Sequence, residues 1–431
     1  MEVLSFILGV VVIVLGLGLS IGLHEIGHLV PAKTFGVRVG QYMIGMGPTI
    51  WSRRFGETEY GVKWLPIGGY ISMAGMYPRS RDDDGARGGL FATLVQDARA
   101  ANDESLEGTD DSRAFFTLPT WKRVIIMLGG PVMNLVLAVV LFSILATGIG
   151  VNQSTTTVAS VSECVLPAGT EQTACEAGDP ASPAAAAGLE PGDTILSIDG
   201  VAVDSFDEAS AIVRAHPGDR IEMVVERDGA ERTLRLTPVL AENAYVDEDG
   251  ERVVAEVGFA GFSPTTERVR QPIWTGAQTA VENTGAVVGI VAQLPARLWD
   301  TAVDLFTGQE RDPNGPISVI GVGRIAGEVA ATEAPILDRV GVMIGLLGSI
   351  NIALFVFNLI PLLPLDGGHV AVALWDALKR GWARLFRRPP PRPADATRLV
   401  PLTLVVVVLL VGMGALLFAA DIFNPVSLLG G

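Results

Sequence analysis

The chain has 431 residues, 49% of them hydrophobic and 18% charged, with a mean hydropathy of +0.42. These values are typical of a membrane protein and not of a soluble enzyme of two or three domains. The formal net charge of −16 argues against a nucleic-acid partner, because binding to phosphates needs a basic surface.

The first predicted element, residues 1–35, is an apolar run that ends in a candidate metal motif. No charged side chain occurs between Val3 and Leu23, and the sequence His-Glu-Ile-Gly-His follows at residues 24–28. On a helix the two histidines share one face, so both can bind one metal ion while the glutamate handles a water molecule. Ionisable residues inside a membrane span usually mark function. We therefore interpret the segment as transmembrane helix 1 and as part of a zinc site; exposed polar residues of a helix are the alternative.

Residues 36–76 are rich in glycine and in strand-forming residues, which predicts a β-hairpin region. A free strand edge near the metal motif could hold an unwound substrate chain by β-augmentation, and an ordinary cytoplasmic hairpin is the alternative. Residues 77–113 have few large apolar side chains and are expected to form a mobile cytoplasmic loop.

Residues 114–150 are predicted to form an interfacial segment and transmembrane helix 2. Aromatic and basic residues precede the span, as at a membrane interface. Inside it, Gly129, Gly130 and Pro131 allow another helix to approach closely. Asn134 lies one turn further on. Because an amide in hydrocarbon needs partners, Asn134 is interpreted either as a buried helix contact or as a substrate-facing residue.

Residues 151–240 are predicted to form a soluble domain. Between Val151 and Arg270 there are 22 acidic and 8 basic residues, which is nearly all of the chain's acidic excess. The sequence Gly-Leu-Glu-Pro-Gly-Asp at 188–193, followed by an alternating strand and an Asp-Gly turn, resembles the signature of PDZ domains. The resemblance implies an α+β fold that binds extended peptides, with a pocket near residues 187–189.

The only two cysteines, Cys164 and Cys175, lie ahead of this signature. Outside the cytoplasm a structural disulfide between them is expected. Two free thiols or a redox-sensing pair are the alternatives.

The last part of the chain is predicted to contain an amphipathic linker at residues 241–338, transmembrane helix 3 at 339–370, a basic loop at 371–398 and transmembrane helix 4 at 399–422. The loop carries seven Lys or Arg residues from Lys379 to Arg398. By the positive-inside rule it is cytoplasmic. Counting back, the acidic domain is extracytoplasmic, and the metal motif and the end of helix 3 share the cytoplasmic side.

Asp366 is a candidate third ligand at the end of transmembrane helix 3. Pro361 and Pro364 break the helix, and Gly367 with Gly368 gives the backbone freedom to turn back toward the histidines. Catalytic zinc commonly takes three protein ligands and leaves a fourth position for water. The alternative is that Asp366 caps the helix that follows.

Three of these motifs, in this order on three spans, resemble the site-2 protease family of intramembrane zinc metalloproteases, and within it the bacterial branch with a PDZ domain that cuts membrane-embedded anti-sigma factors. The motifs are His24-Glu25-x-x-His28, Gly130-Pro131-x-x-Asn134 and Asn358-x-x-Pro361-x-x-Pro364-Leu-Asp366-Gly367. The resemblance implies that Zn²⁺ is bound by His24, His28 and Asp366, with Glu25 as the general base. It also implies that Asn134 and Asn358 position the substrate or the active-site helices, that His369 has a supporting role, and that the hairpin at 36–76 dips toward the membrane.

We therefore predict a polytopic α-helical membrane protein (four transmembrane helices) with a cytoplasmic-side β-hairpin layer and an extracytoplasmic PDZ (α+β) domain. It is expected in the lipid bilayer of the bacterial inner membrane, with the active site near the cytoplasmic side. The expected activity is hydrolysis of peptide bonds in the transmembrane segments of single-span proteins, such as anti-sigma factors, after an upstream site-1-type protease has made a first extracytoplasmic cut. The alternative is a catalytically silent scaffold that holds zinc structurally and presents the PDZ domain. Glu25, which a structural zinc site does not require, favours the protease.

Overall fold

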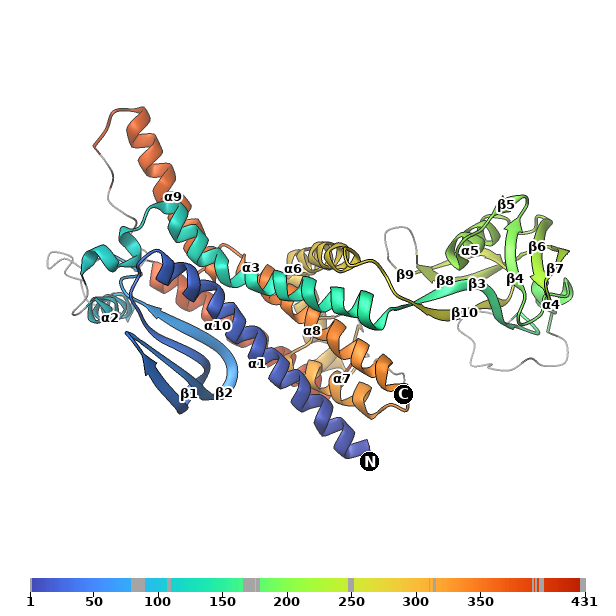
Figure 1. Cartoon of the computed structure of the whole chain (residues 1–431), viewed down its shortest axis with the longest axis horizontal. Helices are drawn as coiled ribbons and strands as arrows, with labels where there is room; N and C mark the ends of the chain where they lie inside the picture. Colours follow the sequence, from blue (N-terminus) through green and yellow to red (C-terminus); the bar gives the residue numbers. More distant parts are fainter. Residues whose placement is uncertain are drawn as a thin grey trace. The chain divides into compact units, whose positions relative to one another are not determined.

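The computed structural model describes residues 2–78, 90–106, 110–165, 175, 179–246, 252–309, 311–312, 315–389, 391, 394 and 399–426. The chain divides into two compact units, one built from Met1–Ile149 and Pro272–Gly431 and the other from Gly150–Gln271. Figure 1 shows the ribbon coloured along the sequence.

Four helices of the first unit, among the described residues, are long and apolar enough to cross a membrane. They are α1 (Glu2–Thr34), α3 (Thr120–Ile144) with the π-helical turn η3 (Leu145–Ile149), α8 (Ile336–Asn358) and α10 (Val400–Phe423). The shortest has 23 residues, and at about 1.5 Å per residue this exceeds the roughly 30 Å of a bilayer core. The prediction of four helices of membrane length is confirmed.

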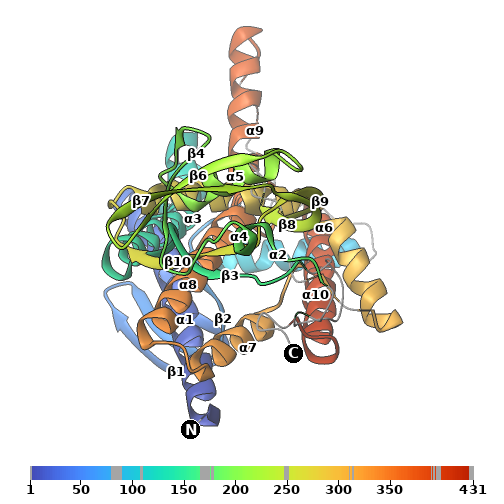
Figure 2. The ribbon, with the colours of Figure 1, turned by 90° about the vertical axis from the view of Figure 1, so that its right-hand side faces the viewer.

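The third span is shorter than predicted. Helix α8 ends at Asn358, and Pro361 and Pro364 lie in the connection that follows, where each removes a backbone donor and stops the helix. A new helix, α9 (Asp366–Leu385), then occupies much of the predicted basic loop at 371–398. Residues 390, 392–393 and 395–398 of that loop lie outside the described residues. In both views the far end of α9 stands clear of the other helices of its unit (Figures 1 and 2).

Helices α1 and α3 cross with their backbones in contact. A Cβ atom on Gly27 would fall 2.2 Å from the Gly129 carbonyl oxygen, and one on Gly129 would fall 2.0 Å from the Gly27 carbonyl oxygen. Only glycine permits this approach. The close helix contact predicted for Gly129 is confirmed, and its partner is the helix that carries the histidines.

The predicted β-hairpin is present and packs on α1. Strands β1 (Val39–Phe55) and β2 (Thr58–Met73) pair antiparallel with several shifts of register. The Tyr42 hydroxyl donates a hydrogen bond of 2.7 Å to the Gly22 carbonyl. Burial and the nearby Glu25 carboxylate raise the pKa of Tyr42 to about 12, so this phenol stays protonated and keeps donating.

Part of the predicted loop at 77–113 is helical. Helix α2 (Leu90–Ser105) is followed by the short 3₁₀ turns η1 (Asp111–Arg113) and η2 (Phe115–Thr117). The Asn102 side chain bonds both the backbone N–H and the carbonyl of Tyr77, which fixes the helix to the end of the hairpin. Residues 79–89 and 107–109 of the predicted loop lie outside the described residues.

Two further helices precede the third span. They are α6 (Thr275–Thr307) and α7 (Val319–Ala331), and both fall in the segment predicted as an amphipathic linker. The Asp421 carboxylate of α10 accepts hydrogen bonds from the backbone N–H groups of Ser318 and Gly321 at the start of α7. This carboxylate satisfies donors that a helix start leaves unpaired.

The second unit is an antiparallel sheet with two short helices and an added hairpin. The sheet has the order β10-β3-β4-β6-β7, and its elements are β3 (Val151–Val161), β4 (Thr194–Ile198), β5 (Val201–Ala202), β6 (Ile221–Arg227), β7 (Ala230–Leu236) and β10 (Phe262–Val269). The helices are α4 (Pro183–Ala186) and α5 (Phe206–Ala215), and the added hairpin is β8 (Val239–Val246) with β9 (Arg252–Phe259). Because β10 pairs with β3, the unit continues past the predicted range 151–240 to Gln271.

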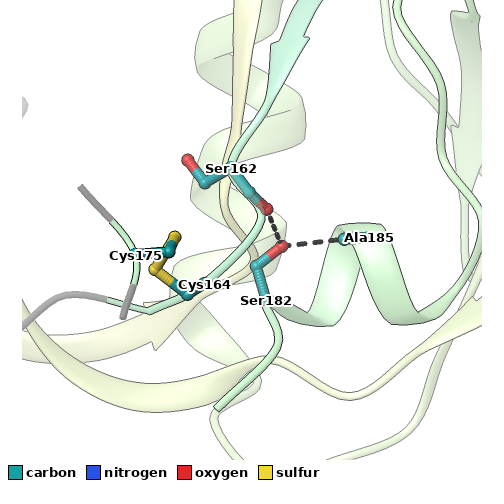
Figure 3. The surroundings of a disulfide bond; sticks show 5 residues. All are labelled: Ser162, Cys164, Cys175, Ser182 and Ala185. Carbon is teal, nitrogen blue, oxygen red and sulfur yellow. Dashed lines mark hydrogen bonds between the residues drawn. A yellow bond between two sulfur atoms is a disulfide. The ribbon is translucent and has the colours of Figure 1, made fainter. Parts of the chain in front are cut away.

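The disulfide predicted between Cys164 and Cys175 is present (Figure 3). Cys164 follows β3, and the adjoining chain is tied to the same sheet end by Ser182, whose hydroxyl donates to the Ser162 carbonyl and accepts from the Ala185 N–H. Ser182 is the N-cap of α4. Residues 166–174 and 176–178 lie outside the described residues.

Candidate metal centre

Atoms of three candidate metal ligands converge where α1 meets the start of α9. The Nε2 atoms of His24 and His28 are 3.1 Å apart, and each is 3.3 Å from Oδ2 of Asp366. All three side chains are buried or nearly so. The structure thus brings together residues 24, 28 and 366, as the sequence predicted, from two helices far apart in the chain.

Asp366 reaches the histidines because α9 starts beside them. It is the first residue of α9, the N-cap position is Leu365, and no side chain caps this helix start. Gly367 and Gly368 have helical rather than left-handed backbones. Both glycines allow close packing. A Cβ atom on Gly367 would fall 2.4 Å from the Leu359 carbonyl oxygen, and one on Gly368 would fall 2.5 Å from the Leu363 nitrogen. The predicted role of these glycines in a flexible turn is therefore wrong.

The orientation of His28 is fixed by α3. Its Nδ1 lies 2.7 Å from the Ile126 carbonyl oxygen, which can only accept, so Nδ1 carries the proton and Nε2 has a free lone pair. Nδ1 of His24 has no hydrogen-bond partner among the described residues.

The geometry of these three atoms fits a zinc ion. Ligand atoms about 2.0–2.1 Å from a tetrahedral zinc lie about 3.3–3.4 Å from one another. The observed separations are 3.1, 3.3 and 3.3 Å. Oδ2 of Asp366 is buried and accepts no hydrogen bond from the described residues, so a cation is the partner that it lacks. Two imidazoles and a carboxylate are also a ligand set that zinc prefers.

Glycines line two sides of the centre. A Cβ atom on Gly130 of α3 would fall 2.2 Å from His28 Nε2 and 2.7 Å from His24 Nε2. Glu25 is 8% exposed, and a Cβ atom on Gly69 of β2 would fall 3.0 Å from its Cγ atom. Sequence reasoning assigned Gly130 to helix packing and missed its contact with both imidazoles. Small residues in a span indicate that another group approaches closely, but they do not identify that group.

Within the described part of the chain, the other polar residues singled out in the sequence form no hydrogen bond or ion pair with the three candidate ligands. Asn134 is fully buried, and neither atom of its amide group has a partner among the described residues. The Asn358 amide donates to the Leu354 carbonyl of its own helix. The His369 ring stacks on Tyr77 with the ring centroids 6.3 Å apart.

An apolar pocket of about 340 Å³ lies beside the connection that carries Asp366. It is lined by residues of this connection, of α9, of the connection between α9 and α10, and of the start of α10, which are Pro361, Leu362, Leu363, Gly368, Ala371, Val372, Trp375, Ala394, Leu399, Leu402 and Thr403. Such a lining accepts hydrocarbon and apolar side chains.

The second unit has a separate cavity of about 920 Å³ between α5 and the edge strand β10. The hairpin of β8 and β9 adds Asn243, Tyr245 and Gly258 to its walls. The pocket was predicted near residues 187–189, but Leu189 is 4% exposed and packs in the hydrophobic core of this unit. The cavity is instead lined by β10 and by the loop before it. The sequence analysis did not identify β10 as a strand of this sheet.

Comparison with known proteins agrees with this geometry. The family model described as Peptidase family M50 matches residues 12–387. The zinc metalloprotease Rip1 of Mycobacterium tuberculosis is 34% identical over 99% of this chain and 100% of its own length. Rip1 of Mycolicibacterium smegmatis is 31% identical over 99% of this chain and 100% of its own length. The metalloprotease MmpA of Caulobacter vibrioides is 28% identical over 88% of each chain.

Proposed function

We propose that this chain, which belongs to peptidase family M50 and is a zinc metalloprotease of the site-2 type, hydrolyses peptide bonds inside the transmembrane segments of single-span proteins. The observation that carries the proposal is the convergence of His24, His28 and Asp366 within a bundle of membrane-length helices, beside the buried Glu25. A metal site of this kind, surrounded by apolar spans, suits a substrate that is itself apolar.

In this proposal His24, His28 and Asp366 hold zinc, and Glu25 is the general base. Zinc, when bound, supplies Lewis acidity and acidifies a water molecule. Glu25 takes the proton from the attacking water and passes it to the leaving amine. The Ile126 carbonyl keeps the proton of His28 on Nδ1, and the hairpin residue Gly69 packs against the buried Glu25. Asn134 and Asn358 are proposed to position substrate.

We place the metal centre near the cytoplasmic face of the bacterial inner membrane and the second unit outside the cytoplasm. The basic residues from Lys379 to Arg398 support this orientation through the positive-inside rule. The disulfide in the second unit supports it too, because disulfides persist in oxidising compartments.

We further propose that the second unit is a PDZ domain that limits which substrates reach the metal. Its sheet, the helix α5 beside the free edge of β10, and the Gly-Asp and Asp-Gly turns support this interpretation. The substrates would be single-span proteins such as anti-sigma factors, shortened first by a site-1-type protease.

The activity is tested with purified full-length protein and a single-span substrate trimmed on its outer side. The wild type should carry about one zinc per chain and cut within the span. Glu25→Gln should keep the zinc and lose roughly 10²–10⁴-fold in rate, the usual worth of a general base. Glu282→Gln, on the exposed side of α6, is the matched control and should keep both. Cleavage by Glu25→Gln at the wild-type rate refutes the assignment.

The role of the second unit is tested by replacing residues 150–271 with a short linker. Val151 and Val269 are paired across β3 and β10, so the chain enters and leaves the unit on neighbouring strands roughly 5 Å apart, and a short linker can bridge the deletion. Cleavage of the trimmed substrate should persist, and cleavage of the untrimmed substrate should rise. Loss of cleavage of the trimmed substrate, with zinc still bound, would make the unit a required docking site instead of a filter.

A further inference from the structure

We infer that Asp376 is a positioning residue of the metal centre, which acts by clamping α9 to α3 through Arg123. The inference rests on the proposed function, because it concerns how Asp366 is held as a zinc ligand. Among the described residues, Asp376 forms no hydrogen bond or ion pair with either histidine.

The clamp is a buried cluster of charges. Both terminal nitrogens of Arg123 lie 3.3 Å from Oδ2 of Asp376. The other carboxylate oxygen accepts from Lys379 Nζ at 3.0 Å and from the Ala394 backbone N–H at 2.7 Å. The Arg123 and Asp376 side chains are 6% and 2% exposed. The cluster therefore joins α3, α9 and the connection to α10 at one carboxylate.

Helix α9 transmits the position of the clamp to Asp366. The two aspartates lie on one helix, ten residues and roughly 15 Å apart. A second contact, from the Arg380 guanidinium to the Thr120 hydroxyl, holds the same stretch of α9 to the start of α3. Beyond it α9 stands clear of its unit (Figure 2). The direction of α9 at Asp366 thus depends on these contacts and on the packing of its first turn.

Helix α3 is the common reference for all three ligands. Ile126 orients His28, Gly130 abuts both imidazoles, and Arg123 holds the helix of Asp366. Positions 123, 126 and 130 are three and four residues apart, so they form one stripe of α3. The face that sets the histidines therefore also sets the carboxylate.

Stability alone does not account for this pair. Burying two charges costs desolvation that their attraction roughly repays, and well-packed apolar side chains usually serve as well or better. What such a pair supplies is a defined geometry, because a shift of α9 would break bonds to a buried charge. A zinc site needs that definition, since its ligands must be placed to about ±0.2 Å.

The chain contains a matched control for this inference. Arg311 and Asp421 form a second ion pair of 2.6 Å, with both side chains 2% exposed. Asp421 also accepts from backbone N–H groups, as Asp376 does. Arg311 lies in the connection between α6 and α7, and Asp421 lies on α10, so this pair includes no residue of α3 or α9. Removing either carboxylate charge leaves a buried arginine without its ionic partner. Only the removal of the Asp376 charge does so on the helices that surround the metal centre.

The experiment compares Asp376→Asn with Asp421→Asn in purified full-length protein. The dissociation constant for zinc is measured by competition with a chromophoric chelator, and thermal unfolding is followed without zinc. Both variants should unfold at lower temperature. Asp376→Asn should bind zinc about tenfold more weakly, the low end of the loss for a partner bonded directly to a ligand, because Asp376 acts on Asp366 only through the helix. Asp421→Asn should match the wild type.

Equal zinc affinity of Asp376→Asn and the wild type overturns the inference, and so does an equal weakening in both variants. If Asp376→Asn does not fold, Arg123→Lys and Arg311→Lys take the same roles, because lysine keeps the charge but not the paired donors of arginine. The proposed function fails separately, if wild-type protein binds no zinc through His24 and His28.

Discussion

Replacing Gly130 by alanine should weaken zinc binding strongly without unfolding the protein. The new Cβ atom would lie 2.2 Å from His28 Nε2 and 2.7 Å from both Nε2 and Cε1 of His24. Carbon and nitrogen atoms that are not bonded approach to roughly 3.2–3.5 Å at best. His28 Nε2 must therefore retreat by about 1 Å, several times the ±0.2 Å that a zinc site tolerates.

The expected loss of zinc affinity follows from the contacts that are broken when His28 moves. Rotating His28 away gives up its bond of 2.7 Å to the Ile126 carbonyl, worth about 1 kcal/mol. It also moves His24, so two of three ligands leave their positions. We expect zinc affinity to fall at least 100-fold, which corresponds to about 2.7 kcal/mol. The metal-free protein should be nearly as stable as the wild type, because the clash is with side-chain ends and alanine favours the helix by roughly 0.5–1 kcal/mol.

The assay is chelator competition for zinc, together with thermal unfolding in the absence of metal. Gly412→Ala in α10 is the control, since a Cβ atom there would meet no atom of the described residues within 4 Å. It should bind zinc as the wild type does. A folded Gly130→Ala protein that binds zinc within twofold of the wild type would refute the arrangement of α3 behind the two histidines.

The remaining predictions concern packing and the second unit. Gly129→Ala should lower thermal stability with or without zinc, by roughly 1–3 kcal/mol or more, because its Cβ atom would lie 2.0 Å from a backbone oxygen of α1; an unchanged melting temperature would contradict the helix crossing. Replacing Cys164 and Cys175 by serine should destabilise the second unit by about 3 kcal/mol on the chain-entropy model, read as faster amide exchange of its strands; two alkylatable thiols in native membranes would rule out the bridge. Asp193→Asn should cost about 1.5–3 kcal/mol, because Asp193 is buried and accepts two bonds of 2.6 Å from Arg227; amide exchange as slow as in the wild type would contradict this. Burial alone would raise the pKa of Asp193, but these bonds lower it. The contribution of Asp193 to the free energy of unfolding should therefore be present above pH about 4 and be lost as the pH falls further. The variant should lack this pH dependence.

The sequence alone determined the parts of this protein that depend on neighbours along the chain. Four runs of apolar residues had to become helices of membrane length, because hydrocarbon offers backbone groups no other partner. His24 and His28 share a face of such a helix whatever surrounds it. Pro361 and Pro364 prevent α8 from continuing, and the helix ends just before them, at Asn358. A hairpin at 36–76 and a bridge between Cys164 and Cys175 followed from equally local patterns and from the compartment.

Only the tertiary structure decided which distant groups meet. Asp366 could cap its helix or turn to the histidines by sequence, and the packing of α9 against α3 put its carboxylate 3.3 Å from both imidazoles. Arg123 and Asp376, 253 residues apart, looked like an interfacial charge and part of a basic loop. Strand β10, at the edge of its sheet, lies in the segment that was predicted to be a linker, for the same reason. Local patterns reflect the intrinsic preferences of consecutive residues, whereas a contact across hundreds of residues exists only once the helices and strands have packed.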